Sequence, residues 1–575
     1  MYTNRPVFSI ARNVVIIALF LPLVMSCSGK EQLVSGDGTV DWNRYYSTEE
    51  THQIMRAFTD MYPDLTRMFS IGKSLKNADL YVMEVSNRKI GAPEEKPALY
   101  VDGNIHSGEL TGSAVTLYLM GYLLNNYGKD PAVTELLDSR TVYLRPKFNP
   151  DGADLALLKN VSLRSTTRPV DNDRDGLADE DPGDDLDGDG FITQMRIPDP
   201  EGNMKKSPDD PRLMVRRDRG ETGGEYYRVI GEGIDNDGDG RLNEDGIGGL
   251  DMNRNFPRNW ELQYLQSGAG AFPLSEPETY ATLQFMNKAT NICFIIHNHT
   301  SGGFLYRLPS TGDPSTFPPD DLELIVTLSD KYNELTGRRV SQSYTSPQSH
   351  RYGTLISWGY WDRGIIGWVP EYWGGIEKDY DGDGNTSELE RLKFNDEELG
   401  GKYFSDWTSY DHPEFGSVEI GGWHRMFISQ NPPDELLEQE CAEQIPWIMY
   451  IAQQTPMLEM SEPSVTAVGD NRYRVEVTVT NDGFIPTNLV DRAINARLIK
   501  EVEVELEMTG AALVVGERKT RIGHLAGSRP VSDDRPGART VSWIVQSESS
   551  NASVTVRVVS EKGGTLSSGV VSLNR

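Results

Sequence analysis

Two segments of the chain carry side chains that can bind a metal. The run PALYVDGNIHSGELTG, residues 97–112, has His106 and Glu109 three positions apart, where an apolar strand gives way to a helix-like stretch. Two further histidines, His297 and His299, end the apolar run ICFIIHNH. Side chains three apart at such a junction face the same side. Two histidines and one carboxylate with an open fourth position form a catalytic zinc site.

The spacing of His106 and Glu109 is a weak signal by itself. The ordinary alternative is a loop histidine followed by a glutamate in the first helical turn, where the helix dipole favours an acidic side chain. The two interpretations differ in what else the chain must contain. A zinc hydrolase also needs a third ligand, a general base and groups that hold the substrate.

Further segments supply such groups in a definite order. Together with HSGE, they resemble the zinc metallocarboxypeptidases of the carboxypeptidase A family. The resemblance covers roughly residues 46–455, and the order and spacing are specific once two long insertions are removed. The segments are NPDG (149–152), DMNRNFPRNW (251–260), FPLSEPET (272–279) and HNHTSGG (297–303).

The resemblance implies a set of zinc ligands. They are His106, Glu109 and one histidine of the HNH run. His299 is preferred because the residues after it, TSGGFLYRLP, best match the family's run after that ligand, and His297 is the alternative. One Zn²⁺ is therefore expected.

The resemblance also implies substrate-binding residues. Asn253 and Arg254 match the family's pair that holds the terminal carboxylate of the substrate. A guanidinium group offers parallel hydrogen bonds to a carboxylate, so the chemistry agrees. Arg164 stands a dozen residues after NPDG, at the spacing of the arginine that stabilises the oxyanion.

The general base in the family is a glutamate on a late strand. Glu371 in GIIGWVPEYW fits because the preceding SWGYWDRG resembles the family's segment before the base. Glu419 in GSVEIGGW is the rival because SQNPPDELL follows it. The insertion between them makes both alignments possible, and we favour Glu371.

The implied activity is zinc-dependent hydrolysis of C-terminal residues from peptides. One alternative is an amidase or endopeptidase that acts on murein peptides, and another is a non-catalytic binding protein of the same fold. Two departures from the family bear on this choice. Gly108 stands where many relatives have arginine, and the family's mobile tyrosine has only the imperfectly spaced candidates Tyr344 and Tyr352. The pocket for the terminal side chain is expected within 349–358.

The acidic segment DYDGDGNTSELE, residues 379–390, fits a twelve-residue calcium loop. Oxygen ligands are expected from Asp379, Asp381, Asp383 and Glu390, and a glycine stands at the sixth position for the sharp turn.

Three more stretches, 171–181, 185–193 and 235–245, share the front half of this pattern. Crowded carboxylates repel one another unless cations neutralise them. One to four structural Ca²⁺ ions are therefore expected.

The alternation of strand-like and helix-like runs predicts an α/β domain over 46–455. The resemblance implies that this domain has the mixed sheet of the zinc carboxypeptidases. The insertions at about 165–249 and 374–416 contain no recognisable regular element. After residue 455 short runs alternate apolar and polar residues between turns. Residues 456–575 are therefore predicted to form an antiparallel β-sandwich that serves as an accessory domain.

The chain begins with a basic and then apolar stretch that ends at Ser26-Cys27. Residues 1–26 are predicted to be a lipoprotein-type signal peptide, with Cys27 as the lipidated residue and 27–45 as a polar tether. This organisation places the protein outside the cytoplasm. Ser28 after the cysteine indicates the outer membrane of a Gram-negative bacterium.

The net charge of −30 excludes nucleic acid as a partner. The expected partners are a peptide substrate and, through the lipid anchor, a membrane. The other two cysteines, Cys293 and Cys441, form no disulfide pattern. Cys293 lies in an apolar run and is expected to be a buried thiol.

Overall fold

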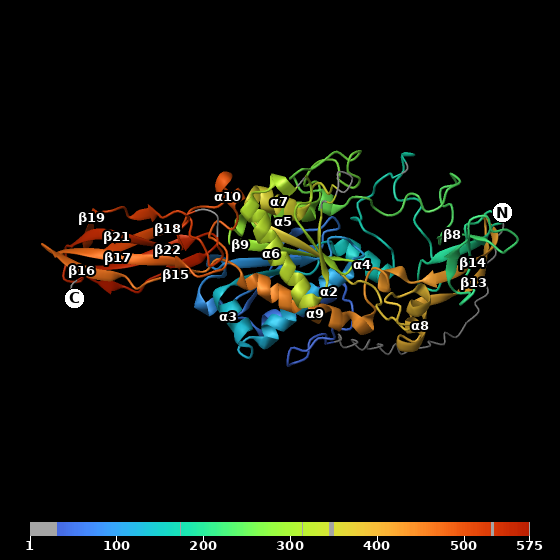
Figure 1. The fold of residues 1–575 in the computed structure, drawn as a ribbon, viewed down its shortest axis with the longest axis horizontal. Helices are drawn as coiled ribbons and strands as arrows, with labels where there is room; N and C mark the ends of the chain where they lie inside the picture. The colour runs from blue at the N-terminus through green and yellow to red at the C-terminus, as the bar shows by residue number, and fades with distance from the viewer. Residues whose placement is uncertain are drawn as a thin grey trace, which may run out of the picture.

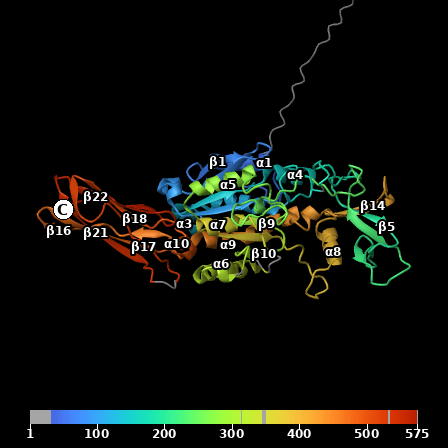
Figure 2. The same ribbon diagram turned by 90° about the horizontal axis from the view of Figure 1, so that it is seen from above.

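The computed structural model describes residues 32–172, 174–312, 314–343, 345, 350–530 and 534–573. The predicted signal peptide and the lipid anchor at Cys27 lie outside these residues. A central α/β body lies between a β-sandwich at one end and a smaller sheet at the other, in both views (Figures 1 and 2). Within the described part of the chain, no helix is both long and apolar enough to cross a membrane.

The central body is built on an eight-stranded mixed sheet in the order β1-β2-β4-β3-β9-β12-β10-β11. The strands β4, β3, β9 and β12 run parallel to one another, whereas β1, β2 and β10 each have antiparallel neighbours. Parallel neighbours bring their C-terminal ends to one edge of the sheet. The strands are β1 (Thr66–Lys73), β2 (Asp79–Val85), β3 (Ala98–Gly103), β4 (Thr141–Arg145), β9 (Ile292–Thr300), β10 (Phe304–Arg307), β11 (Arg339–Gln342) and β12 (Ile366–Tyr372).

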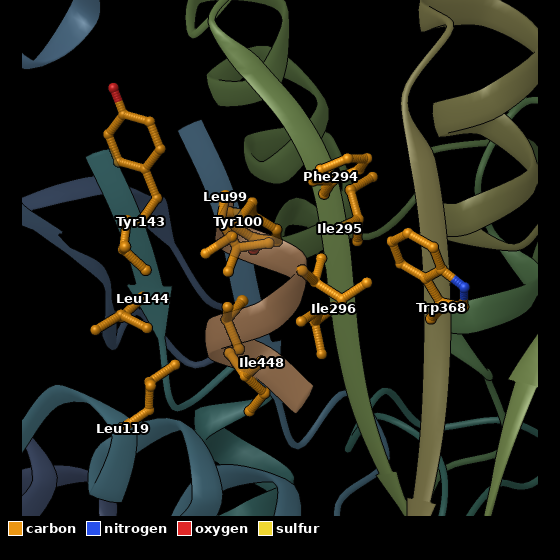
Figure 3. Close-up of a cluster of buried hydrophobic side chains, with 14 of the residues drawn as sticks. Leu99, Tyr100, Leu119, Tyr143, Leu144, Phe294, Ile295, Ile296, Trp368 and Ile448 are labelled. Carbon is orange, nitrogen blue, oxygen red and sulfur yellow. The ribbon is translucent and has the colours of Figure 1, made fainter. Parts of the chain in front are cut away.

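Helices cover this sheet on both faces. As a result, every residue of the central strand β9 is buried. Helix α2 packs against β3, β9 and α9, while α9 also packs against α6, α5 against β1 and α7 against β12. Figure 3 shows Tyr100, Ile295 and Trp368 of three neighbouring strands in the core. The helices are α1 (Thr48–Met61), α2 (Leu110–Asn126), α3 (Pro131–Ser139), α4 (Pro150–Lys159), α5 (Pro277–Lys288), α6 (Pro319–Thr336), α7 (Leu355–Arg363), α8 (Glu388–Glu398), α9 (Asp434–Gln453) and α10 (Asp491–Asn495). The predicted α/β class is confirmed.

The two insertions form a second sheet together. Its six strands run in the order β13-β14-β5-β8-β6-β7, and β14 of the second insertion pairs with β5 of the first. Met195, Ile197, Val418 and Ile420 form a small core on it. The strands are β5 (Gln194–Pro198), β6 (Met204–Lys206), β7 (Met214–Arg216), β8 (Tyr227–Gly231), β13 (Phe404–His412) and β14 (Gly416–Trp423).

The prediction that the insertions lack regular elements is therefore wrong, and the second one extends past its predicted end at residue 416. Strands β6 and β7 have only three residues each, which is too short for an alternating pattern to be recognised. Their partners also come from distant parts of the chain, so the pairing leaves no local signal.

The segment before α1 is also different from its prediction. Val34, Val40 and Tyr45 are buried in the core of the central body. The ring of Trp42 meets that of Tyr118 on α2 edge to face, with ring centres 5.2 Å apart. The prediction of a polar tether over 27–45 is therefore wrong for residues 32–45, because scattered apolar side chains fasten this irregular segment to the domain.

The C-terminal part is a β-sandwich, as predicted. One sheet has the order β15-β17-β21-β19 with β16 paired to β17, and the other β20-β18-β22-β23 with β24 paired to β22. Alternate residues of β17 and β22 point into the shared core. The strands are β15 (Leu458–Met460), β16 (Ser464–Gly469), β17 (Arg472–Asn481), β18 (Glu503–Thr509), β19 (Ala511–Val515), β20 (Lys519–Arg521), β21 (Ala538–Ser547), β22 (Ser553–Ser560), β23 (Gly564–Ser567) and β24 (Val571–Ser572).

The sandwich contacts the central body through buried polar groups. The ammonium group of Lys562 donates a hydrogen bond to the carbonyl oxygen of Ile292 (2.5 Å), at the start of β9. The thiol of Cys293 lies 3.4 Å from the carbonyl oxygen of Lys562. Cys293 and Cys441 are buried free thiols, which confirms the prediction for Cys293.

Candidate active site

Three neighbouring parallel strands deliver the predicted site residues to one edge of the central sheet. His106 follows β3, and Glu109 directly precedes α2. His299 lies near the end of β9, and Glu371 on β12 pairs with it in register. His106 and His299 are almost 200 positions apart in the sequence. They meet, with Glu371 beside them, because β3, β9 and β12 end at the same edge of the sheet.

The turn that carries His106 and Glu109 is held by backbone contacts. Asn104 adopts a positive φ of 67° and donates side-chain hydrogen bonds to the carbonyl oxygens of His106 (2.8 Å) and Ser107 (2.9 Å). Gly112 in the first turn of α2 lies against β9, where a Cβ would be 2.6 Å from the carbonyl oxygen of Asn298. This close approach places the start of α2 beside His299.

The side chain of Glu109 does not cap α2. Its Oε1 lies 2.7 Å from Nδ1 of His106, and its Oε2 lies 2.8 Å from Nδ1 of His299. The two Nδ1 atoms are 3.1 Å apart, and all three residues are at most 3% exposed. The donor atoms of His106, Glu109 and His299, which we call the zinc group, therefore converge on one point.

The donor set suits zinc, which prefers nitrogen, sulfur and carboxylate ligands and keeps one open position in catalytic sites. Among the described residues, other clusters of possible metal ligands consist of carboxylates alone. Burial lowers the pKa of His299 to about 3, which keeps this imidazole in the neutral, metal-binding form. The pKa of Glu109 is lowered overall. Burial raises it, but the charges and hydrogen bonds of His106 and His299 lower it by more, so this carboxylate stays ionised.

Asp251 orients the zinc group and was not recognised from the sequence. Its Oδ1 lies 3.1 Å from Nε2 of His106, on the far side of the ring from Glu109. A carboxylate at this position fixes the orientation of a metal-binding histidine. Asp251 is the first residue of the DMNRNF motif. We recognised that motif in the sequence but assigned no role to its aspartate.

Arg164 reaches the zinc group because its segment pairs with the HSGE turn. The backbone N–H groups of Ser107 and Gly108 donate to the carbonyl oxygens of Arg164 (3.1 Å) and Leu163 (2.7 Å). Its guanidinium donates to Asp251 Oδ2 (3.1 Å) and to Glu109 Oε1 (3.3 Å). A Cβ at Gly108 would lie 3.1 Å from the carbonyl oxygen of Leu163, so this departure from the family matches a tight contact.

Asn253 and Arg254 line the same cavity as His106, His299 and Glu371. The amide nitrogen of Asn253 lies 3.4 Å from Nε2 of His299, and its amide oxygen accepts a hydrogen bond from the backbone of α7 (3.2 Å).

The backbone of this pair is pressed against the segment that precedes α7. Gly353 has a φ of 63°, and a Cβ there would lie 2.2 Å from the carbonyl oxygen of Arg254. Only glycine fits this position without displacing the arginine.

The two candidate bases lie in different parts of the molecule. Glu371 lines the cavity, where burial and then the charge of Glu109 raise its pKa, against the opposing effect of the arginines. Glu419 lies on β14 of the insertion sheet, where its carboxylate accepts hydrogen bonds from the guanidinium of Arg196 (2.8 and 3.0 Å). Of the two, only Glu371 borders the zinc group.

His297 has a different environment from His299. Its Nδ1 lies 2.5 Å from Oδ1 of Asp102 on β3, and both residues are fully buried. It is not part of the converging group, and its ring packs edge to face behind that of His299.

Within the segment expected to form the pocket, Arg351, Thr354 and Ile356 line the cavity. Tyr352 does not line it, and its hydroxyl instead bonds to Nδ1 of His350. Tyr344 lies outside the described residues. Three more lining residues, Tyr306, Ser310 and Ser343, were given no role from the sequence. Tyr306 lies in the run after His299, whereas Ser310 and Ser343 belong to no motif that we recognised.

The calcium-loop prediction concerns a separate, exposed region. Carboxylate oxygens of Asp379, Asp381 and Asp383 lie within 4.8 Å of one another. Asp379 accepts hydrogen bonds from the backbone of Gly382 (2.6 Å) and Gly384 (2.8 Å).

Glu390 lies outside this group of aspartates. Its carboxylate accepts from the backbone of Tyr380 (2.6 Å) and Ser387 (2.8 Å), as part of the capping box of α8. The arrangement of Asp379 recurs in the other loops, where Asp171, Asp185 and Asp235 accept from the third and fifth residues after them.

Comparison with known proteins assigns a family to the central body. The sequence model of the family described as zinc carboxypeptidase matches residues 51–211 and 213–373. Residues 457–571, which form the sandwich, match a domain of unknown function.

Curated relatives are similar over short segments. Mouse carboxypeptidase D is 43% identical over 99 residues, which are 17% of this chain and 7% of the mouse protein. Carboxypeptidase SOL1 of Arabidopsis thaliana is 31% identical over 131 residues, 23% of this chain and 25% of the plant protein. These matches thus span a quarter or less of the relatives' length.

Among solved structures, the crystal structure of thrombin activatable fibrinolysis inhibitor matches with a TM-score of 0.44 and 17% identity, over 72% of this chain and 74% of that one. The carboxypeptidase A of Helicoverpa armigera matches with a TM-score of 0.44 and 12% identity, over 73% and 76%. Because the family model covers more than half of the sequence, this chain belongs to the zinc carboxypeptidase family.

Proposed function

We propose that this protein is a zinc-dependent carboxypeptidase that releases C-terminal residues from peptides. One observation carries the proposal. A buried group of two imidazoles and a carboxylate shares a cavity with a glutamate base and with an arginine that can hold a terminal carboxylate. Membership of the zinc carboxypeptidase family agrees with this reading.

His106, Glu109 and His299 would hold the zinc ion. When bound, zinc polarises the scissile carbonyl and lowers the pKa of a water molecule towards neutrality. Asp251 keeps the His106 ring turned so that Nδ1 points to Glu109 and His299, with which it would hold the ion. All three side chains are buried.

Glu371 supplies the proton transfers. Its carboxylate accepts a proton from the attacking water and then donates that proton to the nitrogen of the departing amine. Because burial raises its pKa, the group is a stronger proton acceptor than an exposed glutamate.

Two arginines have the remaining roles, which are stabilisation of the oxyanion and binding of the terminal carboxylate. The guanidinium of Arg164, which is half exposed beside Glu109, stabilises the negative charge that develops on the carbonyl oxygen. Arg254 with Asn253 binds the terminal carboxylate of the substrate, which restricts cleavage to the last residue.

Calcium is the cation that we propose for the Asp-rich loops, with one to four ions that act structurally. The turns that begin at Asp235 and Asp379 support it most directly, because each gathers three carboxylates of the kind that Ca²⁺ prefers. Asp171 and Asp185 begin turns with the same hydrogen-bond pattern. For Glu390 to join, its carboxylate would have to release backbone N–H groups.

The proposed location is outside the cytoplasm, at the outer membrane, through a lipid on Cys27. The sequence of residues 1–26 and the serine after Cys27 support it. Labelling of the full chain with a radioactive fatty acid, lost in Cys27→Ala, would test the anchor.

The test of the activity compares two peptides that differ only at the C-terminus. The purified full chain should contain one zinc per molecule and release the last residue from a peptide with a free carboxylate. The same peptide with an amidated C-terminus should react at least ~100-fold more slowly, because Arg254 then lacks its partner. Arg254→Ala should remove most of this difference.

Equal rates for both peptides, unaffected by Arg254→Ala, would contradict the proposal. That outcome would favour the amidase or endopeptidase alternative. A zinc-loaded protein that cleaves neither peptide would favour a binding protein.

A further inference from the structure

The cavity beside the zinc group contains more positive charge than the proposed reaction uses. Among the described residues that line it, the cationic side chains are Arg164, Arg254 and Arg351, and the only acidic one is Glu371. Arg164 and Arg254 have roles in the proposed mechanism. Arg351 has none.

Arg351 is fixed at the cavity wall. Its guanidinium donates to the carbonyl oxygen of Ser343 (2.5 Å) and to the hydroxyl of Tyr306 (3.1 Å). It also stacks over the Tyr306 ring, 4.8 Å from the ring centre. These contacts hold the guanidinium group in place at the cavity wall. A preorganised guanidinium is suited to binding a carboxylate.

Ser310 adds an independent observation on the same wall. Its side chain is 2% exposed, and its Oγ has no hydrogen-bond partner within the part of the chain that the structure describes. Its carbonyl oxygen accepts a hydrogen bond from the backbone of Arg351 (3.1 Å), so the two residues are adjacent. A buried hydroxyl without a partner is unfavourable unless a ligand supplies one.

We propose that Arg351 and Ser310 bind a second carboxylate of the substrate, so that the enzyme prefers peptides whose C-terminal residue has an acidic side chain. The inference rests on the proposed function. Arg254 and Asn253 take the main-chain carboxylate, whereas Arg351 and the Ser310 hydroxyl take the one at the end of the side chain.

The rest of the cavity agrees with a small acidic group. Ile356 and Val369 offer apolar contacts for methylene groups. These two side chains lie in the same cavity as Arg351 and Ser310, so a short aliphatic stem and the carboxylate at its end would both find contacts. A basic side chain would meet like charge here.

The net charge of the whole chain does not favour acidic substrates. The chain carries a net charge of −30, so its long-range field repels an acidic peptide. The preference must therefore come from direct contacts with Arg351 and Ser310. Such contacts are less sensitive to salt than long-range attraction.

The experiment uses the zinc-loaded full chain and four peptides that differ only in the last residue, which is Glu, Gln, Leu or Lys. Glutamate and glutamine have the same shape, so their comparison isolates the charge. We expect kcat/KM to be highest for Glu, about 100-fold above Gln, and lowest for Lys.

Arg351→Ala should lower kcat/KM for the Glu peptide by about 100-fold and for the Gln and Leu peptides by less than about 5-fold. Ser310→Ala should lower the Glu rate by about 10-fold. Arg351→Gln, which keeps much of the side-chain volume, repeats the measurement if the alanine variant does not fold. Arg258→Ala removes an arginine that does not line the cavity and pairs with Asp362 (3.6 Å), and it should leave the ranking of the four peptides unchanged.

Two results would overturn the inference. If wild type prefers Leu or Lys over Glu, the second carboxylate site does not exist. If Arg351→Ala and Arg351→Gln reduce all four rates equally, Arg351 has a structural role or binds the main-chain carboxylate. Failure of the zinc-loaded wild type to release any of the four residues would overturn the proposed function itself, and the inference with it.

Discussion

The zinc group and the loop formed by residues 379–390 are both clusters of side chains that could hold a metal ion, but they are built in opposite ways. The zinc group is buried, and the ends of two central strands and the start of α2 hold its ligands. The aspartates of the loop are exposed, and their contacts are mainly with the backbone of the loop itself.

This difference separates the consequences of losing each cation. The surroundings of the zinc group, such as Asp251 and Asn253, belong to the packed core and persist without an ion. Loss of zinc should therefore stop the chemistry and leave the fold. Loss of the proposed calcium should instead loosen the exposed Asp-rich loops and leave the chemistry, because the insertion sheet has its own small core and the loops lie outside it.

The largest expected effect comes from removing a buried ligand. His106→Ala should abolish stoichiometric zinc binding and lower kcat/KM on the order of 1000-fold or more, because the Lewis acid is lost. Metal analysis and a residue-release assay measure both effects. The matched variant Asp381→Ala in the exposed loop should keep zinc and activity. If both variants lose zinc and activity to the same extent, the two clusters do not differ in the way described above.

The next effect tests the base. Glu371→Gln keeps the shape of the side chain but removes its proton acceptor, so kcat should fall about 10²- to 10⁴-fold while zinc stays bound. Glu419→Gln on the insertion sheet should leave kcat within about 2-fold of wild type, because its carboxylate only pairs with Arg196 and Lys206. The reverse pattern would show that our choice of base is wrong.

A smaller effect is expected at Arg164. Arg164→Ala should lower kcat about 10²- to 10³-fold and change KM little, since the charge that it stabilises develops only in the transition state. Steady-state kinetics of release separate the two constants. A rise in KM with unchanged kcat would instead assign Arg164 to substrate binding.

The smallest effect concerns the exposed loops. With zinc present throughout, calcium at 100 times its dissociation constant should stabilise the protein by about 2.7 kcal/mol and raise the unfolding midpoint by on the order of 5 °C. Calorimetry with and without calcium measures the shift. Asp379→Asn should reduce this shift without changing kcat/KM. If calcium does not change the unfolding midpoint of the wild type, the proposal of structural calcium is wrong.

Residue types, local spacing and the resemblance to the zinc carboxypeptidases together predicted much of this protein. The apolar runs that became β3, β9 and β12 were recognisable because buried parallel strands are continuously apolar. The HSGE and DMNRNF motifs each lie within one short segment, so their candidate residues could be named without knowing the fold.

Pairings between distant segments were not predictable. Arg196 of the first insertion faces Glu419 of the second across the β5–β14 pair, more than 200 residues away in sequence. Nothing in the local sequence of either strand marks its partner. The same holds for Arg351 and Ser310, which come together through a contact between two loops.

The sequence by itself determined which chemistry was available: two imidazoles, carboxylates and guanidinium groups, placed at strand ends by local patterns. Only the tertiary structure shows which of the alternative candidates lie together. His299 rather than His297 enters the zinc group, because His297 lies further from the strand end and pairs with Asp102. Glu371 rather than Glu419 borders it, because strand pairing sets Glu371 beside His299, and that register depends on the whole sheet.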